Sequence, residues 1–405
     1  MKVIYSIVLM LLSALLGPAF CAQAGPDVFG EKLSVNSIRL RGRFQNARNR
    51  FVQDEKGIVA FLGGSITERE GYRPLVMKSL RRRFPETEFE FRNAGISSTC
   101  STTGAFRLSR DVLQDRPPDL LFVEFAVNDD QDAHHTHREC IRGMEGIVRH
   151  ARKANPAMDI VILYFVNPDM LATWHSGQVP LSVAGHRQVA RRYQIPAVNV
   201  GKELAHLIDA EELTWEEYGG THPGPSGNRL CASMVECLFR KAWREPVDNG
   251  DRVRPHKIVD VLDEYSYFRG QMLPPGAALN LQNMEVNIPK WDELPGRCRQ
   301  RFRDRHLLCA DEPGAAAQLT FEGSAVGAYV LAGPDAGTVE AVVDGKKRMV
   351  VDLYHEFSKN LHYPRTVMFF QELVPGKHTL SLRLLEQHEN RSKGPALRLM
   401  NFTVN

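Results

Sequence analysis

Residues 59–68, with the sequence VAFLGGSITE, join an apolar run to two glycines, a serine and a polar turn. An apolar run that ends on glycine is typical of a buried strand, and glycine permits both a positive φ and a close backbone approach. The stretch therefore predicts a sharp turn that leaves Ser65 at the carboxyl end of a strand. Open α/β sheets bind ligands at such ends, although a serine there can equally be a helix cap.

The pattern around this stretch alternates apolar strands with segments of helical spacing from residue 57 to residue 242. Near-continuous apolar runs separated by helices predict a parallel sheet that is covered on both faces. Short alternating runs with Gly, Asp and Pro turns fill residues 315–405 and predict a separate antiparallel β-sandwich domain. Residues 247–314 are either an irregular connection or the start of that second domain.

The first 24 residues have the pattern of a signal peptide, with Lys2 before an apolar run and an Ala-Gln-Ala cleavage pattern at the end. The run is short for a membrane anchor. We therefore expect a secreted or periplasmic protein, without stable membrane insertion, whose first domain spans residues 25–246. A formal net charge of +3 over 405 residues gives no basic surface for nucleic acid.

Export makes disulfides plausible for the six cysteines that remain after Cys21 is removed. Cys298 and Cys309 are close in an irregular segment, and we expect them to be bonded. The spacings give no CxxC pair that indicates zinc. We expect neither a metal nor a cofactor.

Two groups of histidines outside the main motifs have more than one interpretation. His134, His135 and His137 follow a predicted strand, and a solvated loop is favoured there over a metal site. His186 begins a predicted helix, where a surface position is favoured over one in a substrate cleft.

Small and polar residues stand where each predicted strand opens toward one rim of the sheet. They are Ser65, Ser98 in NAGISST, Asn128 in FAVND and, before the last helix, His222 in THPGPSG. A serine, a turn of small residues, an asparagine and a histidine are the parts of an acyl-transfer site. These parts are a nucleophile, oxyanion donors and a general base.

The segments GGSIT, NAGISST, FAVND and THPGPSG resemble, in order and relative spacing, the four signature segments of the SGNH hydrolase (GDSL-like esterase) superfamily. EFAVND and AGPDAG…VDG further resemble a secreted bacterial subgroup with an additional C-terminal β domain. The resemblance implies a flavodoxin-like three-layer α/β/α fold that hydrolyses esters, often acetyl groups on polysaccharides, without a cofactor. By position, it implies Ser65 as nucleophile, His222 as base, and Ser98 and Asn128 as oxyanion donors.

Four positions depart from the pattern of this superfamily. Gly64 stands where an aspartate often precedes the nucleophile, and Ala126 replaces the glycine before Asn128. Gly219 stands where an aspartate usually precedes the histidine, which leaves three explanations: a Ser-His dyad oriented by a carbonyl within residues 215–220, rescue by Glu216 or Glu217, or lost activity. Ser98 replaces the usual oxyanion glycine, and we expect its backbone to avoid a strongly positive φ.

The function expected from these residues is that of a secreted serine esterase that hydrolyses carboxylic esters, with acetyl favoured, on a carbohydrate, polysaccharide or small molecule. The alternatives are a non-catalytic carbohydrate-binding protein on a degenerate hydrolase scaffold, or a lipase or acyltransferase of the same superfamily. Tyr354, His362 and Tyr363 are candidates for polymer binding if they are exposed, and edge packing of the sandwich is at least as good an interpretation.

Overall fold

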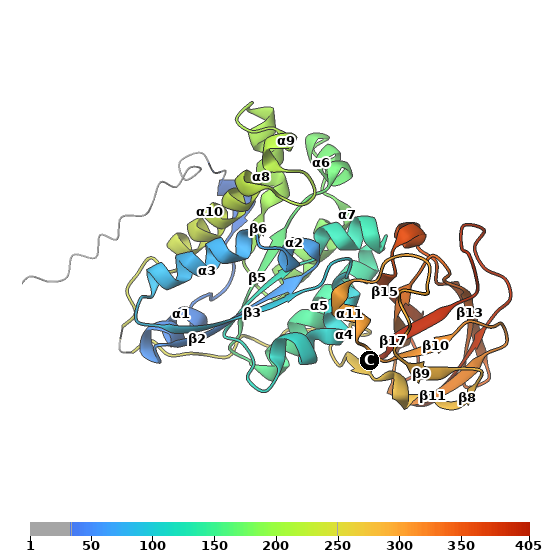
Figure 1. Ribbon diagram of the computed structural model, residues 1–405. Coiled ribbons are helices and arrows are strands. Elements are labelled where there is room, and N and C mark those ends of the chain that lie inside the picture. Colours follow the sequence, from blue (N-terminus) through green and yellow to red (C-terminus); the bar gives the residue numbers. More distant parts are fainter. Residues whose placement is uncertain (1–32, 34, 249) are drawn as a thin grey trace, which may run out of the picture.

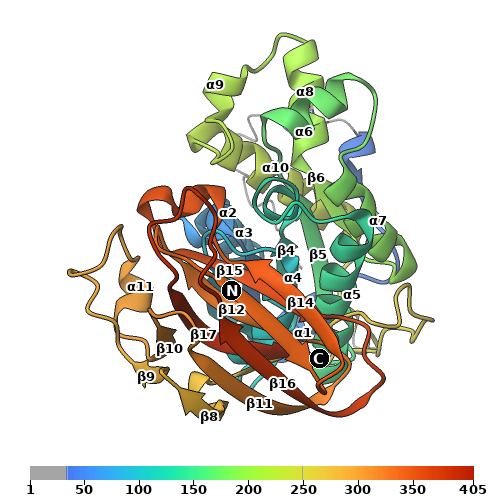
Figure 2. The same ribbon diagram turned by 90° about the vertical axis from the view of Figure 1, so that its right-hand side faces the viewer.

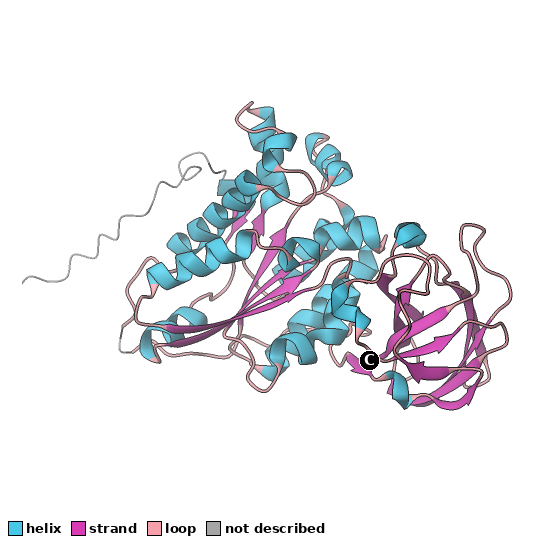
Figure 3. Ribbon diagram, viewed as in Figure 1, coloured by secondary structure: helices cyan, strands magenta, loops and turns pink. Residues whose placement is uncertain are grey.

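The computed structural model describes residue 33, residues 35–248 and residues 250–405, so the predicted signal peptide and Cys21 lie outside the described residues. An α/β part comes first in the chain, and a β-rich part packs beside it (Figures 1 and 3). Within the described residues, none of the helices combines the length and apolar character that crossing a bilayer needs.

The first part contains a sheet with the order β1-β6-β5-β4-β2-β3, in which β2 to β6 are parallel and β1 is an antiparallel edge strand. The order of the parallel strands is that of flavodoxin-like sheets, which confirms the predicted fold class. The strands are β1 (Ile38–Arg39), β2 (Lys56–Gly63), β3 (Glu88–Gly95), β4 (Leu120–Glu124), β5 (Asp159–Tyr164) and β6 (Ala197–Asn199).

Helices cover both faces of this sheet, with α3 and α10 packed together on one face and α4 and α5 on the other (Figure 1). The central strands β4 and β5 are buried along their whole length, which explains their continuous apolar sequences. The helices of this part are α1 (Asn46–Gln53), α2 (Ser65–Glu68), α3 (Tyr72–Arg83), α4 (Ser101–Leu108), α5 (His137–Ala154), α6 (Pro168–His175), α7 (Leu181–Arg192), α8 (Val200–Asp209), α9 (Trp215–Tyr218) and α10 (Pro225–Ala242).

The second part is an antiparallel sandwich, as the alternating runs predict. One sheet has the order β15-β12-β17-β10-β9, with β7 paired to β17, and the other has the order β14-β13-β16-β11-β8. Leu319 and Leu380 of one sheet share a buried core with Val330 and Leu399 of the other. The elements are β7 (Gln271–Leu273), β8 (Leu279–Gln282), β9 (Glu285–Asn287), α11 (Gln300–Arg303), β10 (Leu307–Ala310), β11 (Ala316–Gly323), β12 (Val326–Ala332), β13 (Thr338–Val343), β14 (Lys347–Asp352), β15 (Tyr363–Phe370), β16 (Gly376–Leu384) and β17 (Leu397–Val404).

The sandwich packs against α4, which contacts β7 and β15 (Figure 2). The hydroxyl groups of Thr103 and Thr366 lie 2.8 Å apart across this contact. Because α4 begins next to the loop after β3, the second part lies close to the carboxyl ends of the parallel strands.

The expected disulfide between Cys298 and Cys309 is wrong, because both cysteines are free. Cys309 lies in the buried strand β10, and its sulfur contacts the Leu307 carbonyl at 3.6 Å. The sulfur of Cys298 contacts the Arg299 carbonyl instead, also at 3.6 Å. The two cysteines belong to the same small hydrophobic cluster, but they are not bonded.

A fully buried arginine joins the ends of the two strands that carry the predicted nucleophile and oxyanion loop. Arg107 of α4 donates to the Ala94 carbonyl at 2.6 Å, to the Gly63 carbonyl at 3.0 Å and to Asp111 at 3.1 Å. Buried carbonyls need such partners. A charged side chain therefore fixes the carboxyl ends of β2 and β3 relative to one another.

Replacing Arg107 with Met should lower the free energy of unfolding by about 3–5 kcal/mol, because it leaves Asp111 without its buried cation and the strand-end carbonyls without donors. Arg110 also contacts Asp111, but its side chain is 53% exposed, so Arg110→Met should cost less than about 1 kcal/mol. Urea unfolding followed by circular dichroism compares the two variants. Equal losses would contradict the role given to Arg107.

Candidate active site

The turn between β2 and α2 places Ser65 at the first position of that short helix. Gly64 has a φ of −87° and a ψ of −142°, so the turn does not use a positive φ. Glycine is required there for close approach, because a Cβ atom at residue 64 would lie 2.0 Å from Oδ1 of Asn128. The glycine before Ser65 thus makes room for the asparagine of the neighbouring strand end.

The structure brings Ser65 and His222 together, with 2.8 Å between Oγ of the serine and Nε2 of the histidine. His222 lies in the loop between α9 and α10. The Gly224 N–H donates to the Tyr218 carbonyl at 2.8 Å and closes this loop. Both side chains are half-buried, so the pair remains open to a ligand.

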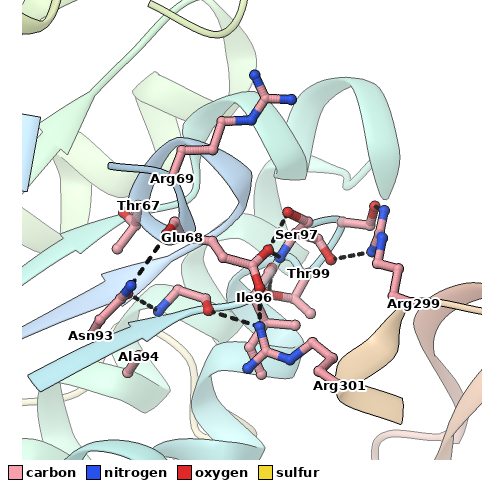
Figure 4. A network of polar contacts seen from close by, with 12 residues as sticks. Thr67, Glu68, Arg69, Asn93, Ala94, Ile96, Ser97, Thr99, Arg299 and Arg301 are labelled. Atoms are coloured by element: carbon pink, nitrogen blue, oxygen red, sulfur yellow. Dashed lines mark hydrogen bonds and ion pairs between the residues drawn. The ribbon is translucent and has the colours of Figure 1, made fainter. Parts of the chain in front are cut away.

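The pKa of His222 is lowered from its ordinary value of 6.5 by burial, and secondly by the positive charge of Arg69. Within the part of the chain that the structure describes, no acidic group contributes to this shift. Arg69 is exposed and points away from the surrounding polar network (Figure 4). The imidazole is therefore neutral at pH 7, the form in which Nε2 can accept the serine proton.

The two glutamates that could have replaced the missing acid are placed elsewhere. Glu217 forms a capping box with Thr214: its carboxylate accepts from the Thr214 N–H at 2.9 Å, and its own N–H donates to the threonine hydroxyl at 3.1 Å. Glu216 is exposed on the same short helix. Neither glutamate is among the groups that shift the pKa of His222.

Gly219 could not be an aspartate in this loop. Its φ is +103°, and a Cβ atom built on it would lie 2.0 Å from the Gly224 nitrogen. This is the same nitrogen that donates to the Tyr218 carbonyl. The loop that presents His222 is thus closed too tightly for any side chain at the position where the superfamily places its acid.

The expectation for the backbone of Ser98 is wrong, because its φ is +70°. A left-handed conformation costs a non-glycine residue about 1–3 kcal/mol, so other contacts must hold it. The Ser98 hydroxyl accepts a hydrogen bond from Arg299 at 2.9 Å, and the same guanidinium donates to the Ser97 carbonyl at 2.9 Å. A residue from the second part of the chain thus holds the predicted oxyanion loop.

Asn128 is buried against the turn that carries Gly64 and Ser65, at the start of the helical segment after β4. Its amide nitrogen donates to the carboxylate of Asp132. An amide nitrogen carries two hydrogens, so one of them remains for a ligand.

Glu124, the last residue of β4, is a site residue that the sequence reasoning missed. Its Oε1 accepts from the Gly64 N–H at 3.0 Å, the Thr67 N–H at 3.2 Å and the Thr67 hydroxyl at 2.8 Å. Burial raises its pKa to about 7, although these hydrogen bonds oppose the rise. The available signal was a carboxylate at the end of an otherwise apolar strand, which needs a buried partner.

Asp129 was missed as well, and it corrects the expectation for two histidines. His186 is fully buried rather than on the surface, with Nε2 2.8 Å from the Asp129 carboxylate. The side chain of His135 is 11% exposed, with Nδ1 3.5 Å from the same carboxylate, whereas His134 and His137 are exposed as expected for a solvated loop.

Two groups of described residues have side chains of the kind that can hold a metal ion. Their possible ligand atoms lie within 4.8 Å of one another, and the groups are Cys100–Asp129–His135 and Asp129–Cys140–His186. Asp129 belongs to both. Its oxygens already accept from the Ser101 N–H at 2.7 Å, the Ser101 hydroxyl at 2.6 Å and His186, so both carboxylate oxygens have protein donors.

Two hollows are lined by residues of the candidate site. A groove of about 520 Å³ is lined by His222, Arg69 and Arg229, and a smaller one of about 180 Å³ lies between the two parts and is lined by Ser98, Asp132 and Tyr363. Tyr363 is only 2% exposed. Tyr354 and His362 are also buried, so these residues pack the sandwich rather than present an aromatic surface.

The first part of the chain has a flavodoxin-like α/β/α fold, with Ser65 and His222 in contact at the carboxyl end of β2. Residues 61–230 match the GDSL-like Lipase/Acylhydrolase family, and this part of the chain is a domain of that family, as its motifs predict. This match supports a carboxylic ester hydrolase. No curated protein matches the sequence of this chain.

Solved structures extend the similarity to both parts of the chain. A two-domain esterase active on acetylated mannans, solved with and without mannopentaose, is 21% identical over 91% of this chain and 96% of its own, with a TM-score of 0.72. An acetyl-xylooligosaccharide esterase from Geobacillus is 16% identical over 48% of this chain and 97% of its own, with a TM-score of 0.38. The first comparison shows a shared two-domain fold.

Restoring the usual acid by Gly219→Asp should lower both activity and stability, because the new Cβ would collide with the Gly224 nitrogen. We expect a loss of about 1–3 kcal/mol in unfolding free energy relative to Gly220→Asp. Gly220 is the matched control, because it also has a positive φ, +80°. A Cβ atom added to Gly220 would have no other atom within 4 Å and so would not collide. A Gly219→Asp enzyme with raised kcat and unchanged stability would contradict this account.

Replacing Arg69 with Gln should raise the pKa of His222, because the positive charge beside the imidazole disfavours its protonated form. As the pH falls, the imidazole would then become protonated at a higher pH. The acid limb of the pH profile of kcat/KM should therefore shift to higher pH. Arg229→Gln is the control, since Arg229 lines the same groove but does not shift the histidine. An unmoved acid limb in Arg69→Gln would refute the electrostatic argument.

Proposed function

We propose that the protein is a secreted serine esterase that removes acetyl groups from a polysaccharide by a Ser65–His222 dyad. The observation that carries this proposal is the 2.8 Å contact between the serine Oγ and the histidine Nε2 at the carboxyl end of the sheet. Activating a serine hydroxyl at neutral pH needs a base at this distance.

In the proposed reaction, Oγ of Ser65 attacks the acetyl carbonyl carbon while Nε2 of His222 accepts the hydroxyl proton. The tetrahedral intermediate collapses when the imidazolium returns that proton to the departing sugar oxygen, which leaves an acetyl-serine. Water then attacks the acetyl carbon as Nε2 accepts its proton. Release of acetate and return of the proton to Oγ restore the starting state.

The negative oxygen of both intermediates needs donors that are already in place. The N–H groups of Ser65 and Ser98 and the free amide hydrogen of Asn128 are the proposed donors. Asn128 suits this role because it packs against Gly64, where a built Cβ would lie 2.0 Å from its Oδ1. Its position is thus coupled to that of the nucleophile.

The dyad without a carboxylate is preferred to rescue by a glutamate. Glu217 is occupied in the capping box with Thr214, and Glu216 is exposed. Without an acid, the imidazolium is less stabilised in the transition state. We therefore assign a larger share of catalysis to the oxyanion donors.

The proposed substrate class follows from the architecture of the chain. The two-domain esterase that shares the fold over 91% of this chain is active on acetylated mannans. The hollow lined by Ser98 and Thr366 lies between the two parts, so a sugar unit bound there would touch both. Export through the predicted signal peptide would place the enzyme where such polymers occur.

Purified protein should release acetate from acetylated mannan and p-nitrophenol from p-nitrophenyl acetate. Ser65→Ala and His222→Ala should each reduce kcat by at least about 10³-fold, because nucleophile and base act as one unit. Equal rates in the parent and Ser65→Ala would refute the esterase and favour a carbohydrate-binding protein. Hydrolysis of the small ester without release of acetate from mannan or acetylated xylan would refute the substrate class only.

Glu216→Gln and Glu217→Gln should each leave kcat within about threefold of the parent, a barrier change of under about 1 kcal/mol. Glutamine also fits a capping box, so the helix before Gly219 should persist in Glu217→Gln. Steady-state kinetics with p-nitrophenyl acetate measure the effect. A hundredfold loss in one variant, with an unchanged circular dichroism spectrum, would make that glutamate a third catalytic residue.

A further inference from the structure

The segment around α11 in the second part of the chain reaches back to the loop that follows β3 (Figure 4). Arg299 donates to the Ser97 carbonyl and the Ser98 hydroxyl, both at 2.9 Å. Arg301 contacts the Gly95 carbonyl at 3.2 Å and the carboxylate of Glu68. Two arginines from outside the hydrolase fold thus bind neighbouring positions of this loop.

Glu68 connects the same loop to the helix that begins at Ser65. Its Oε2 accepts from the Ser97 N–H at 2.8 Å and from the Ser97 hydroxyl. Burial would raise the pKa of Glu68, but the Ser97 hydrogen bonds and the charges of Arg301 and Arg299 lower it overall. The nucleophile helix, the loop and the arginine segment therefore form one polar network.

An apolar contact reinforces this network on its buried side. Ile96, in the loop itself, is 5% exposed and belongs to a small core whose other members come from the second part. They include Trp291, Phe302 and Tyr329. The loop is thus anchored to the second part at Ile96 by packing and at the two following serines by hydrogen bonds.

Ser98 is the strained element of this arrangement, since its φ of +70° is one that glycine adopts freely and serine does not. The hydroxyl that comes with this substitution is the group that Arg299 binds. The arginine contact therefore compensates for the strain that the serine brings to this position.

We propose that Arg299 is a positioning residue that holds Ser98 in the conformation required for its N–H to act as an oxyanion donor. This inference rests on the proposed function, because it concerns the same reaction. The second part of the chain is then needed for turnover of small esters as well as for contact with a polymer. Arg299 acts through Ser98 and does not touch the reacting atoms.

Arg299→Met should lower kcat for p-nitrophenyl acetate by at least about tenfold, with KM within about threefold, because loss of one oxyanion donor typically costs about 10²–10³ in kcat. Arg299→Lys, which keeps the charge but cannot bridge both acceptors, should fall between this variant and the parent. Arg305→Met, an exposed arginine of the same segment, should match the parent. A kcat of Arg299→Met within twofold of the parent would overturn the proposal.

A double-mutant cycle separates positioning from general destabilisation. Because glycine holds a positive φ without strain, adding Arg299→Met to Ser98→Gly should cost less than about threefold in kcat. If Arg299→Met caused the same loss with and without Ser98→Gly, the arginine would not act through this residue, and the proposal would be overturned.

Hydrogen–deuterium exchange gives a readout that does not depend on activity. Peptides that cover residues 95–100 should exchange faster in Arg299→Met than in the parent or in Arg305→Met. If the parent released no p-nitrophenol and Ser65→Ala changed nothing, the proposed function would fail while exchange still tested whether the arginine holds the loop. Unchanged exchange in Arg299→Met would overturn the positioning role.

Discussion

Burial of the carboxyl end of β2 is the constraint on which the site depends. The chain turns sharply there, and its backbone groups are shielded from water, so each needs a partner inside the protein. The Gly63 carbonyl accepts from Arg107 and from the Ile96 N–H, and the Gly64 N–H donates to Glu124. A buried cation and a buried carboxyl group from neighbouring elements thus fix the turn that carries the serine.

The departures from the superfamily pattern follow from how closely the loops approach one another. Gly64 allows Asn128 to pack against the nucleophile turn, and Gly219 allows the histidine loop to close on Gly224. At both positions a side chain would collide with groups that belong to the site. Ser98 is the opposite case, because its added side chain meets Arg299 in a contact from outside the hydrolase fold. Each change is local in sequence, but its reason lies in a residue on another loop or element.

The role of contacts between separate elements also explains what the sequence could and could not predict. Apolar runs and helical spacing are local, so the parallel sheet and the sandwich could be predicted, and a motif placed Ser65 and His222 near one rim. Arg107 acts through contacts between separate elements, which no local pattern marks. Glu124 stands at the end of an apolar strand, but this local signal does not reveal which groups it binds. The same limit explains the wrong disulfide, the buried His186 and the positive φ of Ser98, since each depends on what packs against the residue.

The charges around His222 link these observations. Burial and the charge of Arg69 both lower the pKa of the imidazole. In the proposed reaction, this would favour the neutral base at the start and disfavour the imidazolium that forms. A carboxylate would correct the second effect, but the closed loop at Gly219 leaves no room for one. In the proposed reaction, stabilisation of the transition state would then come mainly from the proposed oxyanion donors, which include Ser98 and Asn128. Contacts from the second part hold the loop of Ser98. In the proposed mechanism, the second part would therefore support the oxyanion donors on which an enzyme without the usual acid depends more strongly.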